Sequence, residues 1–84
     1  MPSMEDFRVE LRAQIKRSAD LGAAHVDLNA GDMHRSVGGY PGPDHRMLLC
    51  CEAMYQAMKV GDVVLVRPAE GSEERLVIRY RLPR

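Results

Sequence analysis

The feature that most limits how this chain can fold is a run of glycine and proline at residues 38–43, GGYPGP. Two consecutive glycines lose too much backbone entropy to continue a helix, and they permit positive φ. Pro41 and Pro43 lack a backbone donor and bias Tyr40 and Gly42 towards extended geometry. We therefore predict a stiff turn here that separates two helical segments.

The segment at 3–22 has the pattern of an amphipathic helix. Ser3 with Asp6 three residues later approximates a capping box, and Gly22 suits the C-cap. Four apolar residues recur at intervals of four: Phe7, Leu11, Ile15 and Ala19. We interpret the basic residues off this stripe as a solvated helix surface rather than a nucleic-acid patch: Arg8, Arg12, Lys16 and Arg17.

A short strand and a second helix are predicted before the turn. Residues 25–29 alternate polar and apolar, which is typical of a half-buried strand. Asn29 with Asp32 three residues later repeats the cap pattern, so a helix is expected over 30–37, with Met33 and Val37 facing inward.

A third helix is predicted after the turn. Pro43 and Asp44 suit its first turn, and Lys59 and Gly61 suit its end. Apolar residues at spacings of three and four define its predicted buried side: Met47, Cys50, Cys51, Met54, Tyr55 and Met58.

The remaining residues predict a β-hairpin. Residues 63–66 are a short β-branched, apolar run, and residues 68–74 are polar and turn-rich. In residues 75–82 one face is apolar and the other carries three arginines and Val77. The order helix, strand, helix, helix, strand, strand is the connectivity of a winged helix domain. We therefore predict the α+β class, with residues 1–84 forming one small winged helix-turn-helix-like domain. The alternative is a small α+β domain with the same elements packed differently.

Size and charge narrow the function classes. A chain of 84 residues can cover a core but not a deep cavity, which favours a binding module over an enzyme. Twelve basic residues balance twelve acidic ones, so nucleic-acid contact requires a local patch. We find neither a membrane-length apolar run nor a signal-peptide pattern, and we expect a cytoplasmic protein without a membrane partner.

The third helix and the hairpin contain the candidate nucleic-acid contacts. The first residues of a recognition helix meet base edges, which selects His45 and Arg46, with Leu49 and Gln56 further along the outer side. The hairpin would add phosphate contacts from Arg67, Arg75, Arg79 and Arg81. Residues 29–59 hold three basic and three acidic residues, which is a weak electrostatic footprint.

Two function classes therefore stay open. The favoured one is nucleic-acid binding, to double-stranded DNA, through the third helix and the C-terminal hairpin. The alternative is protein interaction through the turn at 40–46 or a sheet edge, in association with a DNA-processing system.

Metal binding and catalysis are the less favoured interpretations. His34, Asp44, His45, Cys50 and Cys51 are potential ligands, but no CxxC or HxxxH spacing occurs. The adjacent thiols are poorly placed to bridge each other, and they lie on the predicted apolar stripe, where a nucleophile would lack exposure. We predict buried structural cysteines, with no metal, no cofactor and no enzymatic activity.

The turn itself is assigned a structural role. His34 and Arg35 are expected to bond to its carbonyl groups. The other predicted turn residues are Gly38, Gly39, Tyr40 and Pro41.

The block from residue 31 to residue 51 resembles a family of small, mostly uncharacterised bacterial proteins. Its pattern is Gly-Asp, a hydrophobe, His-Arg, a Val-Gly-Gly-Tyr-Pro turn, His-Arg-Met and Cys-Cys, and the resemblance extends over most of the chain from Asn29. The matching positions are Gly31, Asp32, His34, Arg35, Gly38, Gly39, Tyr40, Pro41, Gly42, His45, Arg46, Met47, Cys50 and Cys51. Leu48 stands where the family pattern has proline, so the start of the third helix is less sharply defined. Similar segments occur in nuclease-containing proteins, and the resemblance implies no specific reaction.

Overall fold

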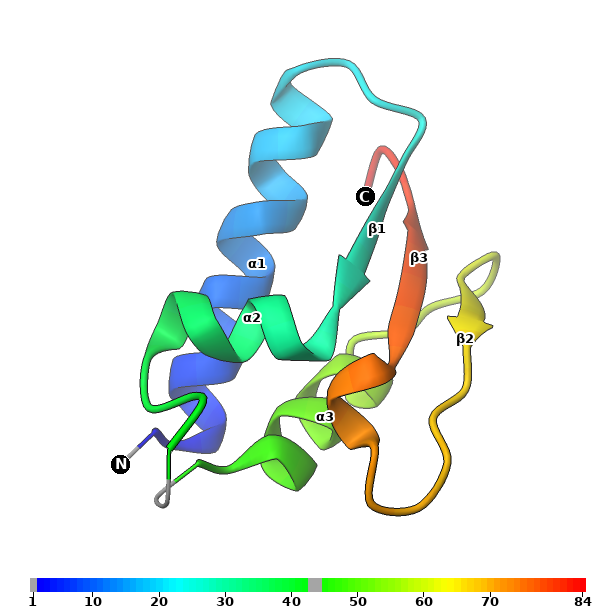
Figure 1. Ribbon diagram of the computed structural model, residues 1–84. Coiled ribbons are helices and arrows are strands. Elements are labelled where there is room, and N and C mark those ends of the chain that lie inside the picture. Colours follow the sequence, from blue (N-terminus) through cyan, green and yellow to red (C-terminus); the bar gives the residue numbers. More distant parts are fainter. Residues whose placement is uncertain (1, 43–44) are drawn as a thin grey trace.

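Three helices and a three-stranded antiparallel sheet make up the structure, a computed structural model that describes residues 2–42 and 45–84 (Figure 1). The predicted α+β class and the predicted order of elements are confirmed. The elements are α1 (Met4–Asp20), β1 (His25–Asn29), α2 (Ala30–Val37), α3 (Met47–Gln56), β2 (Val63–Val66), the 3-10 turn η1 (Glu73–Arg75) and β3 (Val77–Arg81).

Local capping starts the first two helices where the sequence predicts. At α1, the Asp6 N–H donates to Ser3 Oγ at 3.2 Å and the Ser3 N–H donates to Asp6 Oδ2 at 2.8 Å, which completes a capping box. At α2, the Asn29 side chain accepts from the Asp32 N–H at 3.0 Å. The Asn29 amide also donates to the carbonyl oxygens of Glu74 and Leu76, so this cap ties the helix to the segment before β3.

The sheet has the order β1-β3-β2, so β3 pairs on both edges. Val26 lies opposite Tyr80 and Leu28 opposite Ile78 in the β1–β3 register. The inward side chains at and beside β3 are all buried: Leu76, Ile78, Tyr80 and Leu82. Figure 1 shows α1 on one side of the molecule and the sheet on the other, with α2 crossing between them and α3 beneath. The core therefore lies between one sheet face and the three helices.

The third helix differs from the prediction at both ends. It begins at Met47, and Arg46 at its N-cap has non-helical angles, φ −123° and ψ 54°; Pro43 and Asp44, where the start was expected, lie outside the described residues. It ends at Gln56, before the predicted end near Gly61. The Lys59 N–H donates instead to the Asp62 carboxylate, which turns the chain towards β2.

Two side chains also differ from the predicted pattern. Tyr55 was predicted to be buried but is 40% exposed. Arg75 was predicted to lie on the second strand of the hairpin, but it belongs to η1, whose turn precedes β3.

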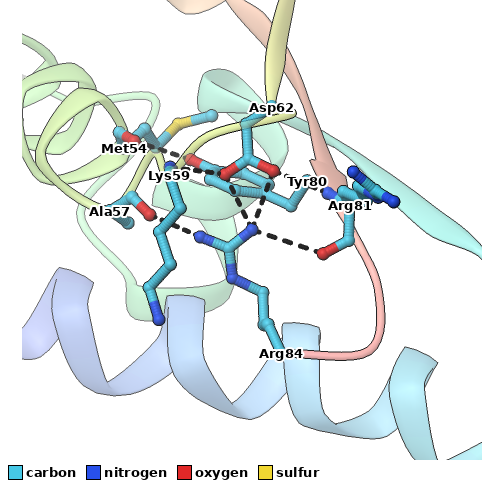
Figure 2. Close-up of polar contacts among 7 residues, drawn as sticks. All are labelled: Met54, Ala57, Lys59, Asp62, Tyr80, Arg81 and Arg84. Carbon is cyan, nitrogen blue, oxygen red and sulfur yellow. Dashed lines mark hydrogen bonds and ion pairs between the residues drawn. The ribbon is translucent and has the colours of Figure 1, made fainter.

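A buried ion pair closes the end of β3 over the end of α3 (Figure 2). Arg84 Nη1 contacts both Asp62 carboxylate oxygens at 2.7–2.8 Å, and Nη2 donates to the Ala57 carbonyl at 2.7 Å. The Asp62 side chain is fully buried, and the Arg84 side chain is 12% exposed. The carboxylate also accepts from the Arg81 and Lys59 N–H groups at 2.7 Å each. One pair therefore connects the α3–β2 loop, the end of α3 and the end of β3.

The Asp62 carboxylate is kept ionised by these contacts. Burial acts to raise its pKa, but the hydrogen bonds from the Arg81 and Lys59 N–H groups and from Arg84 outweigh burial and hold the pKa below the ordinary 3.8. Because the folded-state pKa is the lower one, the stability that this group adds is present above pH 3.8 and is lost as the pH falls through the folded value.

We predict that Arg84→Met lowers the free energy of unfolding by about 2–4 kcal/mol at neutral pH, because it leaves a buried carboxylate without its guanidinium. The matched control is Arg79→Met, which removes an exposed ion pair with Asp27 and should change stability little. Urea denaturation measures both. The difference between Arg84→Met and the parent protein should shrink below about pH 4, and equal stability of the two variants at pH 7 would contradict the assignment.

Candidate functional site

The leading end of α3 is the first candidate surface. His45 and Arg46 are both exposed, directly before the helix. The Arg46 N–H donates to His34 Nε2 at 2.8 Å, and the Met47 N–H donates to His45 Nδ1 at 3.4 Å. The two predicted contact residues therefore reach solvent, while the backbone between them is held by α2.

His34 is the centre of the turn, but it acts differently from the prediction. It accepts from a backbone N–H, and among residues 2–42 and 45–84 it does not bond to a carbonyl. The ring is fully buried and packs edge-on against Phe7, with a centroid separation of 4.9 Å. Its Nδ1 is buried and has no hydrogen-bond partner among the described residues. The rings of Tyr40 and His45 lie beside the His34 ring, with centroid separations of 5.5 and 6.2 Å.

Arg35 also holds the turn by a route that was not predicted. Its guanidinium donates to the Asp32 carboxylate at 2.7 Å and lies 5.3 Å from the centre of the Tyr40 ring. Gly38 and Gly39 have φ of +114° and +85°, which supports the predicted glycine requirement of the turn. Pro41 follows on the exposed side.

The predicted wing arginines differ in their contacts. Arg79 makes a bidentate contact with Asp27 at 2.8 and 3.0 Å, and this hydrogen bond lowers the pKa of the Asp27 carboxyl. Arg81 is exposed two residues further along β3, next to Gly61. Arg67 and Arg75 are exposed at the two ends of the loop that joins β2 to β3.

Gln56 is held by neighbouring side chains. Its amide oxygen accepts from Arg8 at 2.7 Å, and its amide nitrogen donates to Glu52 at 3.3 Å. The Arg8 contact connects the end of α3 to α1.

The solvent face of α3 contains functional candidates that the sequence interpretation missed. Leu48 is 70% exposed and Tyr55 is 40% exposed. Both share a helix face with the exposed Glu52, at offsets of four and seven residues. The sequence contained a signal that this face is exposed: Glu52 lies between Leu48 and Tyr55 on the same side of the helix. A glutamate is almost never fully buried without a partner, so this side was the one to place in solvent.

Strand β2 is the second apolar candidate surface. It pairs with β3 on one edge, and Val63, Leu65 and Val66 are all exposed. An apolar edge strand is a surface that an extended segment of another chain can join.

The two thiols are core groups, as predicted. Cys50 Sγ lies 3.6 Å from the Ala30 carbonyl oxygen, and Cys51 Sγ lies 3.3 Å from that of Glu73. Burial, with a smaller effect of Cys51, raises the pKa of Cys50 to about 12. Burial, together with Glu73 and Glu74, raises the pKa of Cys51 to about 11. Both sulfurs are therefore thiols at neutral pH, the opposite of an activated nucleophile.

Within residues 2–42 and 45–84, no three His, Cys, Asp or Glu side chains converge in a way that could hold a metal ion. None of the helices in the described part of the chain has the length and apolar character that spanning a membrane requires. Comparison with protein-family models, with curated proteins and with solved structures finds no match to this chain.

We predict that His34→Leu lowers the free energy of unfolding by about 2–3 kcal/mol, because it removes the acceptor of the Arg46 N–H inside a packed ring cluster. His25→Leu is the matched control, since His25 is exposed on β1 and its loss should cost less than about 0.5 kcal/mol. Urea denaturation compares the two. A His34→Leu protein as stable as the control would show that the ring does not hold the turn.

Proposed function

We propose that this domain is a winged-helix-type module that binds a protein partner through the solvent face of α3. The connectivity supports the winged-helix assignment: a helix, a short strand, two helices and a hairpin, with the first strand paired to the last in the order β1-β3-β2. In that architecture α3 is the helix offered to a ligand.

The observation that carries the proposal is the composition of this offered face. Leu48 and Tyr55 are the large exposed side chains on α3, and Glu52 lies between them. Leu48 is 70% exposed on the same side of α3 as Tyr55, and covering both side chains with a partner would remove apolar surface from water. Tyrosine is enriched in protein interfaces, where its ring is buried and its hydroxyl bonds at the rim.

The loop beside this helix points to the same class of partner. Residues 67–75 connect β2 to β3. They contain two basic residues, Arg67 and Arg75, and three acidic ones, Glu70, Glu73 and Glu74. Glu52 on α3 adds a further negative charge. Affinity for duplex DNA depends chiefly on cations that neutralise phosphates. An apolar face that carries Glu52 instead suits a protein surface with apolar and basic groups.

The proposal is tested by placing a photo-crosslinking amino acid at position 48 in cells that express the protein. The expected result is one discrete protein adduct that disappears when Glu52→Lys is introduced. A crosslinker at position 60 is the control, because Val60 is fully exposed but lies outside α3. An adduct pattern identical at both positions would contradict the proposal.

We predict that the purified domain does not bind mixed-sequence duplex DNA saturably at low salt, because Glu52 on the α3 face would repel the phosphates. A fluorescence titration at two salt concentrations is the measurement. Binding that weakens steeply as salt rises would overturn the protein-binding proposal and favour phosphate contacts.

A second candidate, duplex binding, is favoured by the exposure of His45 and Arg46 at the start of α3, where recognition helices meet base edges. For this candidate we predict that Arg46→Ala weakens duplex binding while the domain stays folded. Circular dichroism checks the fold, and Arg17→Ala on α1 is the matched control for the loss of one exposed arginine. An affinity unchanged by Arg46→Ala but lowered by Arg17→Ala would exclude α3 as the recognition helix.

A further inference from the structure

A groove of about 790 Å³ lies between α1 and the end of α3. Its apolar lining comes from both helices: Leu11, Ile15, Ala19, Ala53 and Ala57. On α3 this lining is turned away from the Leu48–Tyr55 face, since Ala53 and Ala57 lie at offsets of five and nine residues from Leu48, roughly 140–180° around the helix axis at about 100° per residue. The groove is thus a surface separate from the proposed partner face of α3.

The shape of the groove suits an elongated ligand. Its α1 wall runs from Arg8 to Asp20, which at about 1.5 Å per residue is roughly 18 Å, or three helical turns. Three of the five apolar lining residues are alanines, and small side chains let another helix approach to the 8–10 Å or so of ordinary helix packing.

Positive charge borders the groove along its length. Its cationic residues are Arg8, Arg12, Lys16, Lys59 and Arg84, and its one acidic lining residue among those described is Asp20. Figure 2 shows the Lys59 side chain extending from the α3 side towards the helix that runs below it, α1.

Two of these cations remain available to a ligand. Arg12 contacts Glu5 at 3.4 Å, Lys16 contacts Asp20 at 2.8 Å, and Arg84 contacts the buried Asp62. Arg8 donates to the neutral amide oxygen of Gln56, and Lys59 has no carboxylate partner for its ammonium group among the described residues. The groove therefore combines an apolar base with net positive walls.

We propose that this groove binds an acidic amphipathic helix from a partner protein, about three turns long. Apolar residues three and four positions apart would lie on the half-buried Ile15, Ala19 and Ala57, above the buried Leu11 and Ala53. Asp or Glu residues beside that stripe would face Arg8 and Lys59. Charge on both walls distinguishes this ligand from an acyl chain, which carries its charge at one end. The apolar base distinguishes it from nucleic acid, whose phosphates gain nothing from alanine and leucine. The inference depends on the groove alone and not on the partner of the α3 face.

The test is a selection from a display library of helical peptides of about 14 residues against the full chain, followed by anisotropy titration of the enriched peptides. The expected peptides carry an apolar stripe flanked by Asp or Glu, and they shift backbone amide resonances of α1 and of residues 53–59. The double variant Arg8→Glu/Lys59→Glu should weaken their binding by at least about tenfold, because like charges then face each other.

Two further variants separate the parts of the proposal. Ala19→Gln keeps the charge but places polar bulk in the apolar base, and it should also weaken binding. Arg17→Glu makes one of the two charge reversals of the double variant, but on α1 outside the groove lining, and it should leave binding within about twofold. Circular dichroism confirms that each variant is folded.

Several outcomes would overturn the proposal. They are enrichment of basic or uncharged peptides, no enrichment at all, resonance shifts confined to the Leu48–Tyr55 face, and equal binding by the double variant. Laurate and a single-stranded oligonucleotide are titrated in parallel. Saturable binding of either, weakened by the double variant in the absence of peptide binding, would assign the groove to that ligand instead.

Discussion

The pairing of β3 on both of its edges is the constraint on which the rest of this structure depends. Because β1 and β2 flank it, β3 brings together a segment before the turn and a segment after α3. Its inward side chains supply much of the core that the helices cover. Tyr80 shows the consequence: its buried ring packs beneath the Arg84 guanidinium, and its hydroxyl donates to the Met54 carbonyl of α3 at 2.8 Å. The sheet and α3 are thereby held by one residue of the central strand.

Polar contacts in this small core are placed where the chain changes direction. Asp62 takes the N–H groups of Lys59 and Arg81, so one carboxylate satisfies donors from two segments that leave regular structure. His34 does the same for the Arg46 N–H at the start of α3. Burying a charge is costly unless every part of it is bonded. Both oxygens of the Asp62 carboxylate meet that condition, which explains how an 84-residue chain keeps this group fully buried.

The surface separates into regions of different chemistry although the chain has no net charge. The α3 face is apolar with a glutamate, and glutamates occupy the adjacent β2–β3 loop. The cations of α1 gather instead with Lys59 and Arg84 around the groove. Local field, rather than total charge, decides which ligand each region attracts. The two regions lie on different sides of α3.

Local signals in the sequence determined the elements and much of the turn. The caps at Ser3 and Asn29, the glycine pair and the β-branched run at β2 act over four residues or fewer, so the sequence contains their whole physical cause. The tertiary structure alone decided what depends on distant neighbours. Tyr55 is 40% exposed although its spacing matches that of the buried residues of α3. The Arg79 guanidinium donates to Asp27 on another strand, and Arg8 donates to Gln56, which is 48 residues away in the sequence. Helical periodicity specifies which residues share a face, but only the packing of other elements decides which face meets solvent.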